Sequence, residues 1–131
     1  MSTLRTNALE GVDAKNSITI VAGAGNITTT NVQEGLGLSY CNFDGTGTAS
    51  ITKSFNASSL NDDGTGLYDV NFTSTFNDAD YCSTEGARSE GTFINPSNHN
   101  TTALCAIGCI NSSGSAHDIE TICLLIHGDL A

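Results

Sequence analysis

An alternation of apolar and polar side chains from Leu67 to Thr73 is the feature that most constrains the fold. Tyr68, Val70 and Phe72 would lie on one side of an extended chain, with Asp69, Asn71 and Thr73 on the other. A helix would mix both kinds on every face, so the segment predicts a half-buried β-strand. Ser, Thr, Asn and Gly are abundant and Pro occurs once, which is typical of short strands joined by turns.

Two Asp-Gly-Thr-Gly segments, 44–47 and 63–66, predict turns because Asp-Gly favours backbone positions with positive φ. The segment 48–55 should form a strand with Ala49, Ile51 and Phe55 on one face, which Lys53 interrupts, indicating an exposed edge. Residues 56–59 are expected to lead into a turn over 61–66, and 83–101 to form a long exposed loop or hairpin. No helix is expected. The remaining strands are expected at 17–21, 28–32, 38–43, 79–82, 92–94, 102–110 and 119–127.

The pattern divides the chain into an N-terminal arm, residues 1–36, and a head, residues 37–131. The arm has only scattered apolar residues and cannot form a core alone, so we expect it to pack on a partner or on other copies of the chain. The head predicts an all-β fold, a small antiparallel β-sandwich of jelly-roll-like type. Segments 102–110 and 119–127 are apolar on both faces. We therefore expect the core of the sandwich to cover one face of each segment and a neighbouring subunit of a homo-oligomer to cover the other.

The net charge of −10 makes nucleic acid and anionic membranes poor partners. No segment reaches the roughly 18 apolar residues of a membrane-spanning helix, and no apolar signal follows Arg5. We therefore expect the chain to be made in a cytoplasm and to work there or reach the outside by lysis, without membrane insertion.

The five cysteines sit largely inside apolar segments of a chain without a secretory signal. We expect them to be reduced and mostly buried rather than paired in disulfides. Their spacing does not match a zinc site. They are Cys41, Cys82, Cys105, Cys109 and Cys123.

Convergent titratable groups are hard to find. His99, His117 and His127 lie in a polar loop, a turn and the last predicted strand, with no nucleophile motif near them. The acidic segments 61–64 and 78–80 could offer oxygen ligands to Ca²⁺, but turns closed by side-chain hydrogen bonds explain them equally. The sequence predicts no catalytic residues, no cofactor and no essential metal.

Segments 42–51 and 54–72, Asn-Phe-Asp-Gly-Thr-Gly-Thr-Ala-Ser-Ile and Ser-Phe-Asn-Ala-Ser-Ser-Leu-Asn-Asp-Asp-Gly-Thr-Gly-Leu-Tyr-Asp-Val-Asn-Phe, resemble a pattern of phage tail-fibre-type proteins. Asp78-Ala-Asp-Tyr81 and the closing Cys123-Leu-Leu-Ile-His-Gly128 fit the same pattern. The opening residues 2–7 also resemble virion surface proteins of marine phages, including cyanophages. The resemblance implies β-sandwich-like domains that form trimers on the outside of the particle, and it supplies no catalytic residues.

The expected function is therefore that of a bacteriophage virion structural protein, a short tail fibre or receptor-binding protein taking part in host attachment. The alternative is a capsid decoration protein, a cement or knob that stabilises the shell. A carbohydrate-binding or carbohydrate-cleaving module is a third reading, which the low aromatic content of 6% disfavours. The expected partners are further copies in a homotrimer, phage tail or capsid proteins through the arm, and a host surface glycan. The expected location is the outer surface of the virion.

Overall fold

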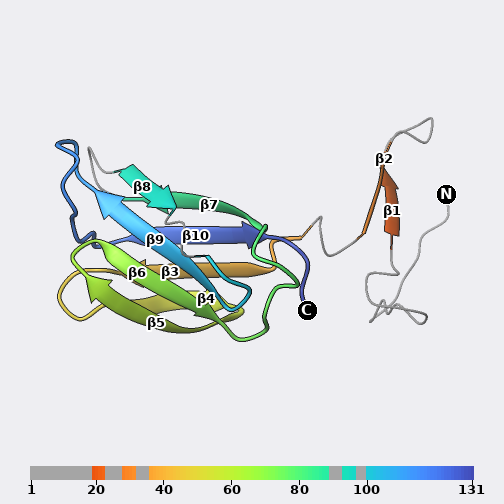
Figure 1. The fold of residues 1–131 in the computed structure, drawn as a ribbon, viewed down its shortest axis with the longest axis horizontal. Helices are drawn as coiled ribbons and strands as arrows, with labels where there is room; N and C mark the ends of the chain where they lie inside the picture. The colour runs from red at the N-terminus through yellow and green to blue at the C-terminus, as the bar shows by residue number, and fades with distance from the viewer. Residues whose placement is uncertain (1–18, 23–27, 32–35, 89–92, 97–99) are drawn as a thin grey trace.

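Alternating segments of the sequence become strands of two facing four-stranded antiparallel sheets in the computed structural model (Figure 1). The structure describes residues 19–22, 28–31, 36–88, 93–96 and 100–131. These residues form ten strands and no helix. The strands are β1 (Thr19–Ala22), β2 (Thr28–Asn31), β3 (Ser39–Asp44), β4 (Ser50–Phe55), β5 (Ala57–Gly64), β6 (Leu67–Phe72), β7 (Cys82–Ala87), β8 (Phe93–Pro96), β9 (Leu104–Ile110) and β10 (Ile122–His127).

The two main sheets are named here by strand order. Sheet I has the order β4-β3-β10-β7 and sheet II the order β5-β6-β9-β8. The chain passes repeatedly from one sheet to the other, and β10 pairs with both β3 and β7 although it follows them by many residues. The all-β class and the small antiparallel β-sandwich are therefore confirmed.

The core lies between the sheets and consists of the inward side chains of both. On β6, Tyr68, Val70 and Phe72 are buried as the alternation predicts. Phe43 on β3 meets the Tyr68 ring edge to face, with ring centroids 5.2 Å apart. On β10 the buried residues also alternate, Ile122, Leu124 and Ile126 facing inward.

The prediction that Ile51 and Phe55 lie on the same face of the 48–55 strand is wrong. Phe43 pairs with Ile51 and Asn42 with Lys53, so a β-bulge between these pairs places an extra residue on β4. The bulge reverses the alternation, so Ile51 packs against the core while Phe55 is 53% exposed on the outer face of sheet I. The prediction that this strand lies at an edge is confirmed, because β4 ends the sheet.

Two polar strands were not expected where they occur. Residues 57–64, read as a lead-in and turn, form β5, and the turn is shorter, at Thr65 and Gly66. Cys82 was expected to end a strand over 79–82, and residues 83–87 to belong to a long loop or hairpin over 83–101. Instead, residues 82–87 form β7 and residues 79–81 are not in a strand. Both strands lie at sheet edges where outward side chains meet water, so their polar composition does not oppose strand formation.

The strands expected near 17–21 and 28–32 are confirmed as β1 and β2, which form a two-stranded sheet of their own. Apart from these two strands and Leu36, the predicted arm lies outside the described residues, so the division into arm and head stays a prediction. The strand near 92–94 is confirmed as β8, which pairs with β9.

Candidate functional site

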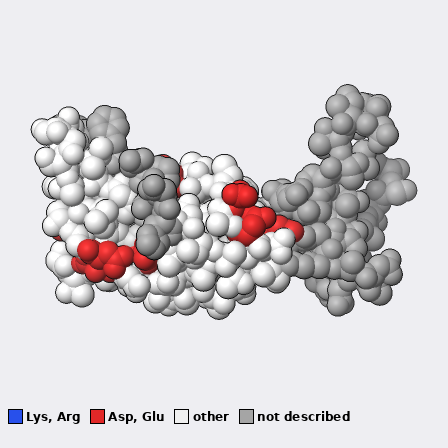
Figure 2. Space-filling view, viewed as in Figure 1, with Lys and Arg blue, Asp and Glu red and all other residues white. Residues whose placement is uncertain are grey.

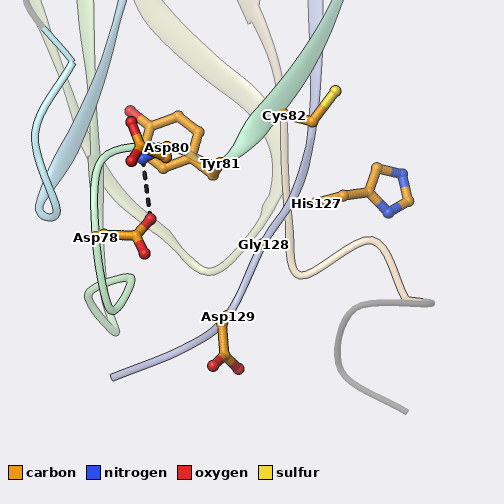
Figure 3. Close-up of a pocket in the computed structure, with 7 residues that line it drawn as sticks. All are labelled: Asp78, Asp80, Tyr81, Cys82, His127, Gly128 and Asp129. Carbon is orange, nitrogen blue, oxygen red and sulfur yellow. Dashed lines mark hydrogen bonds between the residues drawn. The ribbon is translucent and has the colours of Figure 1, made fainter. Parts of the chain in front are cut away.

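An open hollow of about 330 Å³ lies at one end of the sandwich, where the β6–β7 connection meets the end of β10 (Figure 3). Three of its seven lining residues are aspartates. Its lining comprises Asp78, Asp80, Tyr81, Cys82, His127, Gly128 and Asp129.

Backbone hydrogen bonds hold the two walls of the hollow together. The Asn77 N–H donates to the Asp129 carbonyl oxygen at 2.7 Å, and Phe76 forms a β-bridge with Leu130. Gly128 is required at this contact: a Cβ there would lie 2.8 Å from Tyr81 Cβ and 2.9 Å from Phe76 Cδ1. The walls therefore meet only because this residue has no side chain.

Tyr81, which lines the hollow, belongs to a cluster of three aromatic rings. Phe72 and Phe76 have ring centroids 4.8 Å apart, and Tyr81 lies 5.7 Å and 5.0 Å from them. The Tyr81 hydroxyl donates to the Leu104 carbonyl oxygen at 2.7 Å, and burial raises the pKa of that hydroxyl. Tyr81 thus joins the two sheets rather than presenting its hydroxyl as an acid or base.

The carboxylates of the hollow do not converge on a shared point. The Asp80 N–H donates to Asp78 Oδ1 at 2.9 Å, a local turn that occupies this oxygen (Figure 3). Figure 3 shows the Asp129 carboxylate pointing away from the Asp78 carboxylate. Within the described ranges, no group of three or more His, Cys, Asp or Glu side chains is placed to hold a metal ion.

Cys82 and His127 are cross-strand partners on β7 and β10 at the outer rim of the hollow. A nucleophile and its base must lie within hydrogen-bond reach, oriented by a third group. Figure 3 shows the thiol and the imidazole pointing in different directions, and both are turned away from Asp78. The pair therefore does not form a catalytic dyad in this geometry.

A second polar cluster lies at the opposite end of the sandwich and is structural. The buried Tyr68 hydroxyl lies 2.9 Å from both the Gly45 carbonyl oxygen and Asp118 Oδ1, and shares its proton between them. The Gly66 N–H donates to the same Asp118 oxygen at 2.6 Å. Burial, and then the hydrogen bond to Asp118, raise the pKa of Tyr68. The cluster ties the ends of β3, β6 and the segment before β10 together.

The acidic turn segments of the sequence behave as local turns. The Gly64 N–H donates to Asp62 Oδ1 at 3.1 Å at the end of β5. The Thr46 hydroxyl and N–H both donate to Asp44 Oδ1, at 2.7 Å and 2.8 Å, which lowers the pKa of Asp44. These hydrogen bonds account for the acidic residues without an ion, and the absence of a bound metal stays a prediction.

The histidines of the sequence are not brought together. His117 is exposed in the turn before β10, and its backbone N–H donates to the Cys109 carbonyl oxygen at 3.0 Å. His127 lies at the hollow, and His99 lies outside the described residues.

The cysteines are free thiols, and the expectation of burial holds for three of them. Burial raises the pKa of Cys41 and Cys109 to about 11 and that of Cys105 to about 12. Cys82 and Cys123 are exposed. The apolar segment around Cys123 concealed the alternation of β10, which turns this thiol outward.

Comparison with known protein families, curated proteins and solved structures finds no match to this chain. Among the described residues, no helix is long and apolar enough to span a membrane. The hollow was missed by sequence reasoning because its walls lie about 50 positions apart in the chain, at 78–82 and 127–129. The acidic segment 78–80 was noted in the sequence, but nothing in it indicated that residues 127–129 lie beside it.

Proposed function

We propose that this chain is a structural protein on the outer surface of a bacteriophage particle, a short tail fibre or receptor-binding protein. The observation that carries the proposal is the order of turn and strand motifs over residues 42–72, which resembles phage tail-fibre-type proteins. In the structure this stretch supplies the two consecutive hairpins β3–β4 and β5–β6. The all-β sandwich is compatible with that class of protein.

The surface chemistry also supports a non-enzymatic role. Figure 2 shows acidic side chains in two groups on this face of the molecule, with no Lys or Arg between them. Such a surface repels nucleic acid. The titratable groups of the hollow diverge, and the hydroxyls of Tyr68 and Tyr81 are engaged in hydrogen bonds with the fold itself.

In this role the head, residues 37–131, would face the host, and the arm, residues 1–36, would attach to tail or capsid proteins. Three copies of the chain would associate as a homotrimer. A host surface glycan would be the receptor, because the Ser, Thr and Asn side chains abundant in this chain offer hydroxyl and amide groups for hydrogen bonds to sugar hydroxyls.

Quantitative mass spectrometry of purified particles of the encoding phage tests the proposal. A tail fibre should be present in a handful of copies for each particle, and antibodies against the head should block adsorption to the host. Hundreds of copies, with no effect of the antibodies, would indicate the capsid decoration protein instead. Absence of the chain from purified particles would overturn both.

A further inference from the structure

The outer face of sheet I carries a row of apolar side chains that crosses the sheet. Strand register places Phe55, Tyr40 and Leu125 side by side on β4, β3 and β10. The Tyr40 and Phe55 rings are stacked with centroids 6.1 Å apart. Phe55 is 53% exposed and Leu125 is 39% exposed. We call this the Phe55–Tyr40–Leu125 row.

The apolar surface continues beyond the row. A Cβ on Gly37 would lie 2.8 Å from Leu125 Cδ1, so the chain enters β3 in contact with the Leu125 side chain. Leu36, the preceding residue, is 52% exposed. Three of the four exposed large hydrophobic residues of the described chain thus lie on or beside this face, and the fourth, Leu67, belongs to sheet II.

The same face carries little charge in a chain whose net charge is −10. The neighbouring row comprises Lys53, Asn42, Cys123 and Gly86, and its only formal charge is positive. Asp44, at the end of β3, is the acidic residue of this face. The other acidic side chains of the described sandwich belong to β5, β6, β7, the turn before β10 and the hollow.

This charge distribution identifies the occupant. A basic partner would be drawn to the acidic groups of sheet II and the hollow, and nucleic acid would be repelled. Two copies of an acidic chain repel each other least when they meet through their least acidic face, and Lys53 can then attract an acidic side chain of the neighbour. We propose that the Phe55–Tyr40–Leu125 row is the surface through which the chain associates with a second copy of itself.

The proposal rests on the self-association in the proposed function and names a surface for it. From the sequence, a neighbouring subunit was expected to cover segments 102–110 and 119–127. These segments contain β9 and β10, which are inner strands of different sheets. The outward residues of β9 are buried or half-buried, whereas Cys123 and Leu125 on the outer face of β10 are exposed.

The area of the outer face of sheet I limits the affinity expected for self-association. Four strands about 4.8 Å apart and about 20 Å long cover roughly 400 Å² in plan. Stable interfaces bury about 800 Å² on each partner, so this one lies at the lower end of specific contacts. We expect reversible association with a Kd on the order of micromolar rather than an obligate oligomer.

Sedimentation equilibrium of the full chain over a range of concentrations tests the surface. The average mass of the wild-type chain should rise with concentration. Leu125→Glu should weaken association at least tenfold and give a monomer over the same range. Leu67→Glu, which adds the same charge at a residue 47% exposed on sheet II, should associate like the wild-type chain.

Cooperative melting by circular dichroism confirms that each variant is folded, and Phe55→Glu replaces Leu125→Glu if that variant is not. A wild-type mass that stays monomeric at every concentration overturns the proposal, as does equal weakening by Leu67→Glu. The assay uses purified protein alone, so its outcome is separate from whether the chain is found in phage particles.

Discussion

Removing the Tyr68 hydroxyl tests whether the polar cluster at one end of the sandwich stabilises the fold. Tyr68→Phe keeps the ring that packs against Phe43 and deletes only the oxygen that lies 2.9 Å from Gly45 O and from Asp118 Oδ1. The ring is 1% exposed, so water cannot easily replace the hydroxyl at the buried Gly45 carbonyl.

The expected loss of stability in Tyr68→Phe follows from the hydrogen bond that each acceptor loses. A neutral hydrogen bond contributes about 1 kcal/mol, and one to a charged group about 1.5–3 kcal/mol. Here one proton is shared between the two acceptors, and Asp118 retains the Gly66 N–H at 2.6 Å. We therefore expect the free energy of unfolding to fall by about 2 kcal/mol. For a domain of this size that corresponds to a decrease in Tm of roughly 8–16 °C.

The chain contains no Trp, so urea denaturation is best followed by far-UV circular dichroism. Tyr40→Phe is the matched control, because Tyr40 lies on the outer face of sheet I and its loss of a hydroxyl should cost less than about 0.5 kcal/mol. A change below about 0.5 kcal/mol in Tyr68→Phe, or equal changes in the two variants, would refute the role assigned to the cluster.

Three further outcomes are expected. Glu85 faces the interior from β7 with its Oε1 buried and without a hydrogen-bond partner among the described residues, so Glu85→Leu should leave Tm unchanged or raise it; a clear decrease in thermal melts would contradict this. Burial raises the pKa of Cys41 and Cys109 from 9.0 to about 11, so their contribution to stability is fully present below pH 9 and is lost as pH rises through about 11. In urea denaturation, the free energy of unfolding should fall more steeply as pH rises above 9 in the wild-type chain than in a Cys41→Ala, Cys109→Ala double variant. The same pH dependence in both proteins would contradict this prediction. In dilute native protein a thiol reagent should label Cys82 and Cys123 quickly and the other three only on unfolding; rapid labelling of a third would show that the core is not closed as described.

The sequence predicted those parts of the fold that depend on local alternation. The β6 strand could be assigned because Tyr68, Val70 and Phe72 are separated by polar residues within one segment. The polar strand β5 could not, because edge strands need no apolar outer face and its Asn-Asp-Asp-Gly end resembles a turn. The outward position of Phe55 was also hidden, since a β-bulge has no reliable sequence signal.

Local sequence patterns could not predict that β9 and β10 lie in different sheets, nor that a hollow forms at the end of β10. Both depend on pairings between distant segments, such as Leu124 with Cys41 and with Glu85. For the same reason the sequence indicated that segment 119–127 has two apolar faces, but not which of them the core would cover.

The central position of β10 has a consequence for biosynthesis. This strand follows every other strand of the sandwich in the chain, yet β3 and β7 are joined within sheet I only through it. While the ribosome is still translating residues 122–127, the emerging chain can form the β3–β4 and β5–β6 hairpins but leaves β3 and β7 with unpaired edges. Such edges can pair with other nascent chains on the same messenger. Sheet I therefore cannot be completed before β10 has left the ribosome, and chaperones that shield exposed strand edges should increase the yield of folded protein.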